Sequence, residues 1–199
     1  MKLFNESIYI NTKDRLSQFE LNNCIHQMIG EITKSYDKIA VICIGTDRST
    51  GDSYGPLAGH LLSKYTLYEF DLYGTLYEPV HALTLEKTIK RINEEKTLII
   101  AIDSSVGYSD YVGCIGIKYG SISPGRGVGK NLPSIGDIAI SGVVAVSGFS
   151  PILMLQSASL GMVYTMAEKT TRAIAYSLYK LQIEKHRSSV GSKVFSLES

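Results

Sequence analysis

Apolar residues along the chain alternate between short continuous runs and stripes at helical spacing. The run at residues 39–44 is apolar throughout, and the run at residues 97–102 is apolar after Thr97, which is typical of strands buried on both faces. Helical spacing predicts an amphipathic helix over residues 15–32, a second helix from Leu57 with Pro56 in its first turn, and a third over residues 83–94. A weaker strand, half exposed, is expected within residues 66–75. This order predicts parallel strands joined by right-handed crossovers.

The second half of the chain predicts a change of strand direction. Residues 104–111 are all that separates the 97–102 strand from the next one at 112–119, and a parallel crossover normally needs a dozen residues or more. A further strand is expected within residues 137–146, a short helix at 152–156 and a long one over 160–181. Residues 1–12 and 184–199 are expected to be irregular. We therefore expect an α/β fold with a mixed sheet, forming a single domain over residues 1–199 with its core at about 14–185.

Composition narrows the class of protein and its surroundings. The 199 residues are 44% apolar and 20% charged, with a formal charge of +1, so the balance indicates neither a nucleic-acid nor a membrane partner. The cysteines are odd in number and far apart, which favours buried thiols in a reduced, cytoplasmic protein over a disulfide framework. The N-terminus lacks a signal-peptide core, and polar residues interrupt the weakly polar run at 138–155.

Two acidic residues follow the predicted buried strands. Asp52 lies in the loop GTDRSTGDSYGP after the first strand, and Asp103 ends the 97–102 strand. Because the carboxyl ends of parallel strands share one crevice, two such carboxylates can share a proton and activate water, or hold a metal ion that does so. The competing interpretation of Asp52 is an ordinary helix cap. Asp103 is harder to explain structurally, because a buried carboxylate is costly without partners.

Three further residues of this loop, Thr46, Asp47 and Arg48, are candidates for substrate binding. Asp47 and Arg48 can instead pair with each other, while Arg48 can bind an acidic group of a substrate or hold an aspartate ionised. His81, after the predicted second strand, is a candidate acid, base or ligand, although a lone histidine is more often structural.

A glycine-rich segment, PGRGVGK, supplies candidate substrate-binding residues at Gly125, Arg126, Gly127 and Lys130. It matches neither phosphate-loop pattern, so a lid or peptide-binding loop is the better functional interpretation, and a surface turn the structural one. A nucleotide-binding protein stays as a third hypothesis. The chain has no GxSxG elbow, and none of its cysteines has a histidine at motif spacing.

Several separate motifs resemble one family. The segments GTDRSTGDSYGP, YGTLYEPVHAL, IIAIDSSVG, PGRGVGKNLPSIGDIAISG and GFSPILMLQSASL are similar to sporulation proteins of spore-forming bacteria that are named as spore proteases. That family looks like a shortened relative of the germination protease and, more remotely, of the hydrogenase maturation endopeptidases. The resemblance implies a three-layer α/β/α fold of the phosphorylase/hydrolase-like kind. It also implies a five-stranded mixed sheet in the order 2-1-3-5-4, with strand four antiparallel.

The resemblance also implies roles for the two aspartates. In the germination protease the corresponding aspartates are the catalytic pair, which here are Asp52 and Asp103. In the maturation endopeptidases the same positions and a later histidine bind a nickel ion of the substrate. This chain has no histidine between His81 and His186, so a divalent metal is not favoured and no cofactor is expected.

The leading hypothesis is a cytoplasmic endopeptidase of the forespore or spore core, in which Asp52 and Asp103 activate water and His81 shapes the site. Its partners would be a peptide or protein substrate, with small acid-soluble spore proteins as the class that the resemblance suggests, and a homo-oligomer is left open. The alternative is a non-catalytic sporulation factor that binds a peptide or protein in the same crevice. Loss of turnover in Asp52→Asn or Asp103→Asn with binding retained distinguishes the two.

Overall fold

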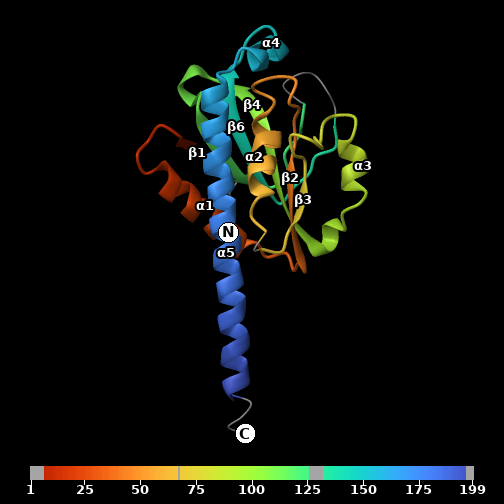
Figure 1. Cartoon of the computed structure of the whole chain (residues 1–199), viewed down its shortest axis with the longest axis vertical. Coiled ribbons are helices and arrows are strands. Elements are labelled where there is room, and N and C mark those ends of the chain that lie inside the picture. The colour runs from red at the N-terminus through yellow and green to blue at the C-terminus, as the bar shows by residue number, and fades with distance from the viewer. Residues whose placement is uncertain (1–6, 67, 126–131, 196–199) are drawn as a thin grey trace.

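The computed structural model describes residues 7–66, 68–125 and 132–195, with side chains described as far as residue 184. Its strands are β1 (Ile8–Asn11), β2 (Lys38–Cys43), β3 (Asp71–Tyr73), β4 (Thr97–Gly107), β5 (Cys114–Tyr119) and β6 (Ile138–Val146). Its α-helices are α1 (Ser17–Glu31), α2 (Tyr54–Leu62), α3 (Leu85–Ile89), α4 (Pro151–Gln156) and α5 (Leu160–Phe195). Figure 1 shows these elements around one sheet, with α4 at one end and α5 running along the body and beyond its other end.

The six strands form one mixed sheet in the order β1-β5-β6-β4-β2-β3. The pairs β2–β3, β2–β4 and β4–β6 are parallel, whereas β5 pairs antiparallel with both β6 and β1. The α/β class, the mixed sheet and the antiparallel direction of β5 are therefore confirmed. The relative order of the five predicted strands also agrees with the observed order.

The apolar strands contribute side chains to two hydrophobic cores, one on each face of the sheet, because successive side chains of a strand point to opposite faces. One face of the sheet packs against α1, α2 and α5 through a cluster that includes Val41, Ile100 and Ile140. The other face packs against the chain around α3 through a smaller cluster that includes Ile42 and Leu85. The helices thus cover both faces, which is why the buried parts of the central strands are continuous apolar runs.

The expected count of five strands is wrong, because residues 8–11 form β1 at the edge of the sheet. Its partner β5 lies about a hundred residues away in the sequence, so no local pattern reveals the pairing. The ring of Tyr9 lies over Gly116 of β5, where an added Cβ would lie 2.8 Å from it.

Three predicted helix boundaries also need correction. Helix α2 begins at Tyr54 rather than Leu57, although Pro56 still lies in the first turn. The predicted 83–94 helix contains only the five-residue α3 and ends before a separate short turn at Glu94–Lys96. Helix α5 continues to Phe195 instead of ending near residue 181, so the predicted irregular tail is wrong for most of its length.

Strand β4 extends to Gly107, beyond the apolar run that ends at Ile102. Its polar end stays paired with β6, with a register shift between Ser105 and Val106. Asp103 therefore lies inside a strand, not at its end. Among the described residues, no helix is both long enough and apolar enough to span a lipid bilayer.

Candidate functional site

A crevice of about 700 Å³ opens at the carboxyl ends of the parallel strands. Its walls come from the segments after β2 and β3, from β4 and β5, from residues 122–125, and from α4. This volume is within the usual range for ligand pockets. The structure brings Asp52, Asp103, His81, Thr46, Asp47, Arg48 and Gly125 to the same crevice.

Close backbone packing fixes the loop that carries Asp52. Gly45 has φ +140°, a conformation that favours glycine, and an added Cβ there would overlap the carbonyl oxygen of Asp52. The amide of Thr46 donates to that same carbonyl at 3.1 Å, which closes the loop. On the other side, the amide of Gly51 donates to the carbonyl of Leu155 in α4 at 2.8 Å. Asp52 is thus held between the end of β2 and α4.

The Asp52 carboxylate does not cap α2. The N-cap residue is Ser53, and no side-chain hydrogen bond caps this helix. The carboxylate instead accepts a hydrogen bond from the Ser104 hydroxyl, with 3.2 Å between Ser104 Oγ and Asp52 Oδ1. Asp52 is half buried and lines the crevice. The helix-cap interpretation of this residue is therefore wrong.

Asp103 is a buried carboxyl group, with 8% of the residue exposed. Its Oδ1 atom accepts a hydrogen bond from its neighbour's amide, Ser104 N, at 2.9 Å. Burial raises the pKa of Asp103 well above its ordinary value, the charge of Asp52 raises it further, and the Ser104 amide lowers it in part. Asp103 therefore stays protonated at pH values where an ordinary aspartate is ionised.

Ser104 joins the two acidic groups. Its amide donates a hydrogen bond to Asp103 and its hydroxyl donates one to Asp52, so the two carboxyl groups share one hydrogen-bond partner. A buried carboxyl group with a raised pKa, next to a second carboxyl group, is the arrangement in which one acts as an acid and the other as a base. The site can therefore activate water and polarise a carbonyl oxygen at the same time.

His81 is half buried and lies on the crevice wall. It directly follows Val80, which forms an isolated β-bridge with Ile44. Its Nδ1 atom accepts a hydrogen bond from the Leu83 amide at 3.2 Å, which in the neutral ring assigns the proton to Nε2. The hydrogen bonds described for His81 join it to its own loop, at Leu83 and Thr84. A direct catalytic role of His81 remains a prediction.

The residues Thr46, Asp47 and Arg48 form a local turn at the mouth of the crevice. The Thr46 hydroxyl accepts from the Arg48 amide at 3.3 Å and donates to Asp47 Oδ1 at 3.5 Å. Asp47 and Arg48 are exposed, and over the described ranges their side chains are not joined by an ion pair. Arg48 thus presents its guanidinium to the crevice and the solvent.

The glycine-rich segment can be placed only in part. Pro124 and Gly125 line the crevice, whereas Arg126, Gly127 and Lys130 lie outside the described residues. Their predicted role in substrate binding stays a prediction.

Several wall residues were not nominated from the sequence, among them Ser104, Lys118 of β5, Leu132, and the α4 residues Ile152 and Leu155. Ser104 had a visible signal, since it directly follows Asp103. Lys118 had a weaker one, as a cation inside the apolar strand IGIKY. Leu132 and the α4 residues reach the crevice only through tertiary packing.

The described side chains do not offer a conventional metal site. In residues 7–66, 68–125 and 132–184, no three His, Cys, Asp or Glu side chains converge closely enough to hold an ion. In this part of the chain the two aspartates therefore lack a third protein ligand for a metal ion.

Comparisons with known proteins give a family and a fold. A family model described as "Protein of unknown function (DUF1256)" matches residues 9–173. The chain is 46% identical over 131 residues to the "Uncharacterized protein YyaC" of Bacillus subtilis (strain 168). This alignment covers 65% of the chain and 64% of the length of the relative, slightly under two thirds.

Among solved structures, the chain is similar to a [NiFe] hydrogenase maturation protease, HycI, from Thermococcus kodakarensis KOD1, with a TM-score of 0.51 and 16% sequence identity. The similarity covers 78% of the chain and 99% of that protein. At this identity the likeness establishes the fold, a protease-like α/β fold, and not the reaction. The matches name neither sporulation nor a spore protease, so that part of the expected resemblance is not shown.

Proposed function

The chain belongs to the DUF1256 family, and from that premise and the geometry of the crevice we propose that it is a peptide-bond hydrolase that uses Asp52 and Asp103 as an acid–base pair. The observation that carries the proposal is the joint contact of both carboxyl groups with Ser104, in a crevice at the carboxyl ends of parallel strands. Support for the protease class comes from the fold shared with a maturation protease.

The raised pKa of Asp103 supports one division of roles between the two aspartates. Buried and next to Asp52, Asp103 is the group that keeps its proton, and it donates a hydrogen bond to the carbonyl oxygen of the scissile peptide. Asp52, half buried at the crevice, accepts a proton from the attacking water. The new C–O bond gives a tetrahedral intermediate, and the proton held by Asp52 then passes to the leaving amine as the C–N bond breaks. The Ser104 hydroxyl orients Asp52 during these transfers.

We also propose the biological setting that the sequence motifs suggest, namely hydrolysis of a peptide or protein in the cytoplasm of the forespore or spore core. Small acid-soluble spore proteins are the first substrates to test. His81 and Gly125 would shape the crevice, and Thr46, Asp47 and Arg48 would contact the substrate at its mouth.

The test is incubation of the full chain with small acid-soluble spore proteins and with a mixed fluorogenic peptide library, followed by mass spectrometry of the products. Cleavage is expected for the wild type, and a loss of roughly 10³-fold in kcat for Asp52→Asn and for Asp103→Asn. Asp110→Asn, a change of the same kind at an exposed position, is the control and should retain activity.

Other outcomes decide against the proposal. If the wild type binds these substrates without cleaving them, the hydrolase proposal is wrong and the protein is a non-catalytic peptide-binding protein. If EDTA abolishes cleavage by the wild type, the mechanism is metal-assisted and the metal-free acid–base mechanism is wrong.

A further inference from the structure

Lys118 places a positive charge on the wall of the crevice, away from the two aspartates. It lies near the end of β5, is half buried and lines the crevice. In the pairing of the strands, Lys118 is opposite Ala139 of β6, and Ala139 is opposite Ala101 of β4. Asp103 is two residues beyond Ala101, so it points to the same face of the sheet as Lys118.

This register fixes the spacing between the two groups. Lys118 is two strands across from Asp103 and two residues along, which places their Cα atoms about 12 Å apart. An extended peptide covers this distance in about three to four residues. A chain whose scissile bond lies at Asp52 and Asp103 therefore reaches Lys118 with a group a few residues away.

The ammonium group of Lys118 is available to a ligand. Within residues 7–66, 68–125 and 132–184 it makes no hydrogen bond or ion pair. Lys34 is the contrasting case, because its ammonium donates to the Thr97 carbonyl and to both oxygens of Asp137. A half-buried cation gains most from an anion that replaces the water it has lost.

The surroundings of Lys118 suit one end of a peptide. Apolar side chains of Ile122 and Leu132 line the crevice together with it, so a bound carboxylate would be partly shielded from water. A ligand carboxylate in contact with Lys118 lies several times closer to that ammonium than to Asp52 and Asp103, and the Coulomb energy falls with distance. Attraction to Lys118 is therefore the larger electrostatic effect on such a group.

We propose that Lys118 is a specificity subsite that binds a carboxylate of the peptide, either an acidic side chain or the free C-terminus, about three to four residues from the hydrolysed bond. This inference rests on the proposed function, because it places the scissile bond at the aspartates. It names the class of substrate as a peptide with a negative charge at a fixed distance from the cleavage point.

The probes are fluorogenic peptide libraries in which one position at a time is fixed as Glu, Gln or Lys, with each library made as a C-terminal acid and as an amide. The wild type should prefer Glu over Gln about tenfold at a single position, as expected for one charge-assisted hydrogen bond. Preference for the acid over the amide, without preference for internal Glu, would identify the free C-terminus as the source of the carboxylate.

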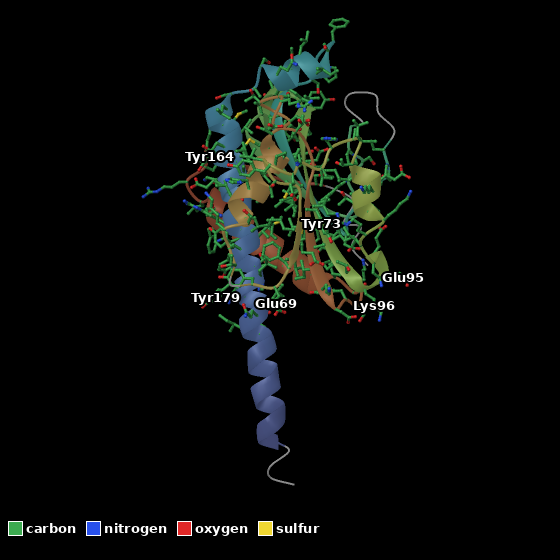
Figure 2. All side chains as sticks on the ribbon, turned by 45° about the vertical axis from the view of Figure 1, so that its right-hand side comes forward. Glu69, Tyr73, Glu95, Lys96, Tyr164 and Tyr179 are labelled. Atoms are coloured by element: carbon green, nitrogen blue, oxygen red, sulfur yellow. The ribbon has the colours of Figure 1, made fainter. Side chains whose placement is uncertain are left out.

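Variants of Lys118 test the assignment. In Lys118→Met the ratio of Glu to Gln should fall to about one, and in Lys118→Glu the preference should shift to the Lys library. Lys96→Glu is the control, because it makes the same charge change at the end of the sheet away from α4. Figure 2 shows Lys96 there beside Glu95. This variant should keep the preference for Glu. Thermal melts establish that each variant is folded.

Binding of the same Glu and Gln peptides to the wild type, measured by fluorescence polarisation, separates the two proposals. Equal cleavage and equal binding of Glu and Gln peptides would overturn the Lys118 subsite and leave the hydrolase standing. Tighter binding of Glu peptides that depends on Lys118, with no cleavage of any library, would support the subsite and overturn the hydrolase.

Discussion

Two aspartates at different positions along the sheet have opposite surroundings. Asp137, just before β6 at the amino ends of the parallel strands, accepts hydrogen bonds from the Lys34 ammonium at 2.8 and 3.0 Å and from the Ile99 amide at 2.8 Å. Asp103 accepts a hydrogen bond from the Ser104 amide and has a second acid, Asp52, as its charged neighbour. The first carboxylate is neutralised by the fold, whereas the second is left with unfavourable electrostatics at an open crevice.

The comparison distinguishes Asp137, an aspartate with a structural role, from Asp103, an aspartate placed for acid–base catalysis. Burial near a like charge costs folding free energy and is characteristic of functional sites. A hydrogen-bonded ion pair such as Lys34–Asp137 instead holds the start of β6 against β4. The same residue type thus serves two purposes, and its partners decide which.

The largest expected effect is on catalysis. Asp103→Asn should lower peptide hydrolysis roughly 10³-fold and leave the chain folded, because the acid of the proposed pair is lost. Asp137→Asn should instead leave kcat near the wild-type value and lower the free energy of unfolding by about 1–2 kcal/mol, because Lys34 loses its charged partner. Steady-state kinetics and urea denaturation of both variants measure this contrast. Similar effects of the two changes on both quantities would remove the distinction.

A smaller effect is expected from the packing that supports the crevice. Gly55, in the first turn of α2, lies against β2 so closely that an added Cβ would overlap the carbonyl oxygen of Ile44. Gly55→Ala should therefore destabilise the fold by about 2–3 kcal/mol.

Gly30 in α1 is the matched control for this change, because an added Cβ there meets nothing within 4 Å. Gly30→Ala should be neutral or stabilising by up to about 1 kcal/mol, since alanine favours helix. Thermal melts of the two variants compare the sites. Equal stability would mean that α2 can move away from the sheet at no cost.

The smallest expected effect is the pH dependence of stability. Because the pKa of Asp103 is raised in the folded chain, its favourable contribution is complete below the ordinary aspartate pKa and is lost as pH rises through the raised value. Asp103→Asn removes this loss, so it should be more stable than the wild type by about 1 kcal/mol near pH 8. The difference should shrink toward about pH 4.

Urea denaturation of the wild type, Asp103→Asn and Asp110→Asn across that range is the measurement. The exposed Asp110 controls for the change in net charge. A difference between wild type and Asp103→Asn that does not grow with pH would contradict the raised pKa.

Local patterns predicted the central strands well and the periphery poorly. The apolar runs in β2 and β4 are long, and the eight residues after Asp103 are too few for a crossover, so direction and class followed from elementary constraints. Strand β1 was missed because its four residues are specified by the pairing with β5 and not by their own period. The extent of β4 was missed because its polar end is a strand only through its pairing with β6.

The site shows the same limit. Asp52 and Asp103 could be nominated because both follow buried strands, but the sequence could not tell whether Asp52 caps a helix or meets Ser104. Lys118 was missed because its face of the sheet depends on the register of three strands. Residues such as Arg126 remain untested, since they lie outside the described part of the chain.

The close contacts of Gly45, Gly51 and Gly55 have a consequence for redesign of this protein. At each of these positions an added Cβ would meet backbone atoms, so these three glycines around the Asp52 loop admit almost no substitution. The walls of the crevice instead include side chains of His81, Leu83, Lys118 and Ile152, which are half buried or exposed. Directed evolution toward a new ligand should therefore accumulate its changes in these walls and keep the three glycines intact.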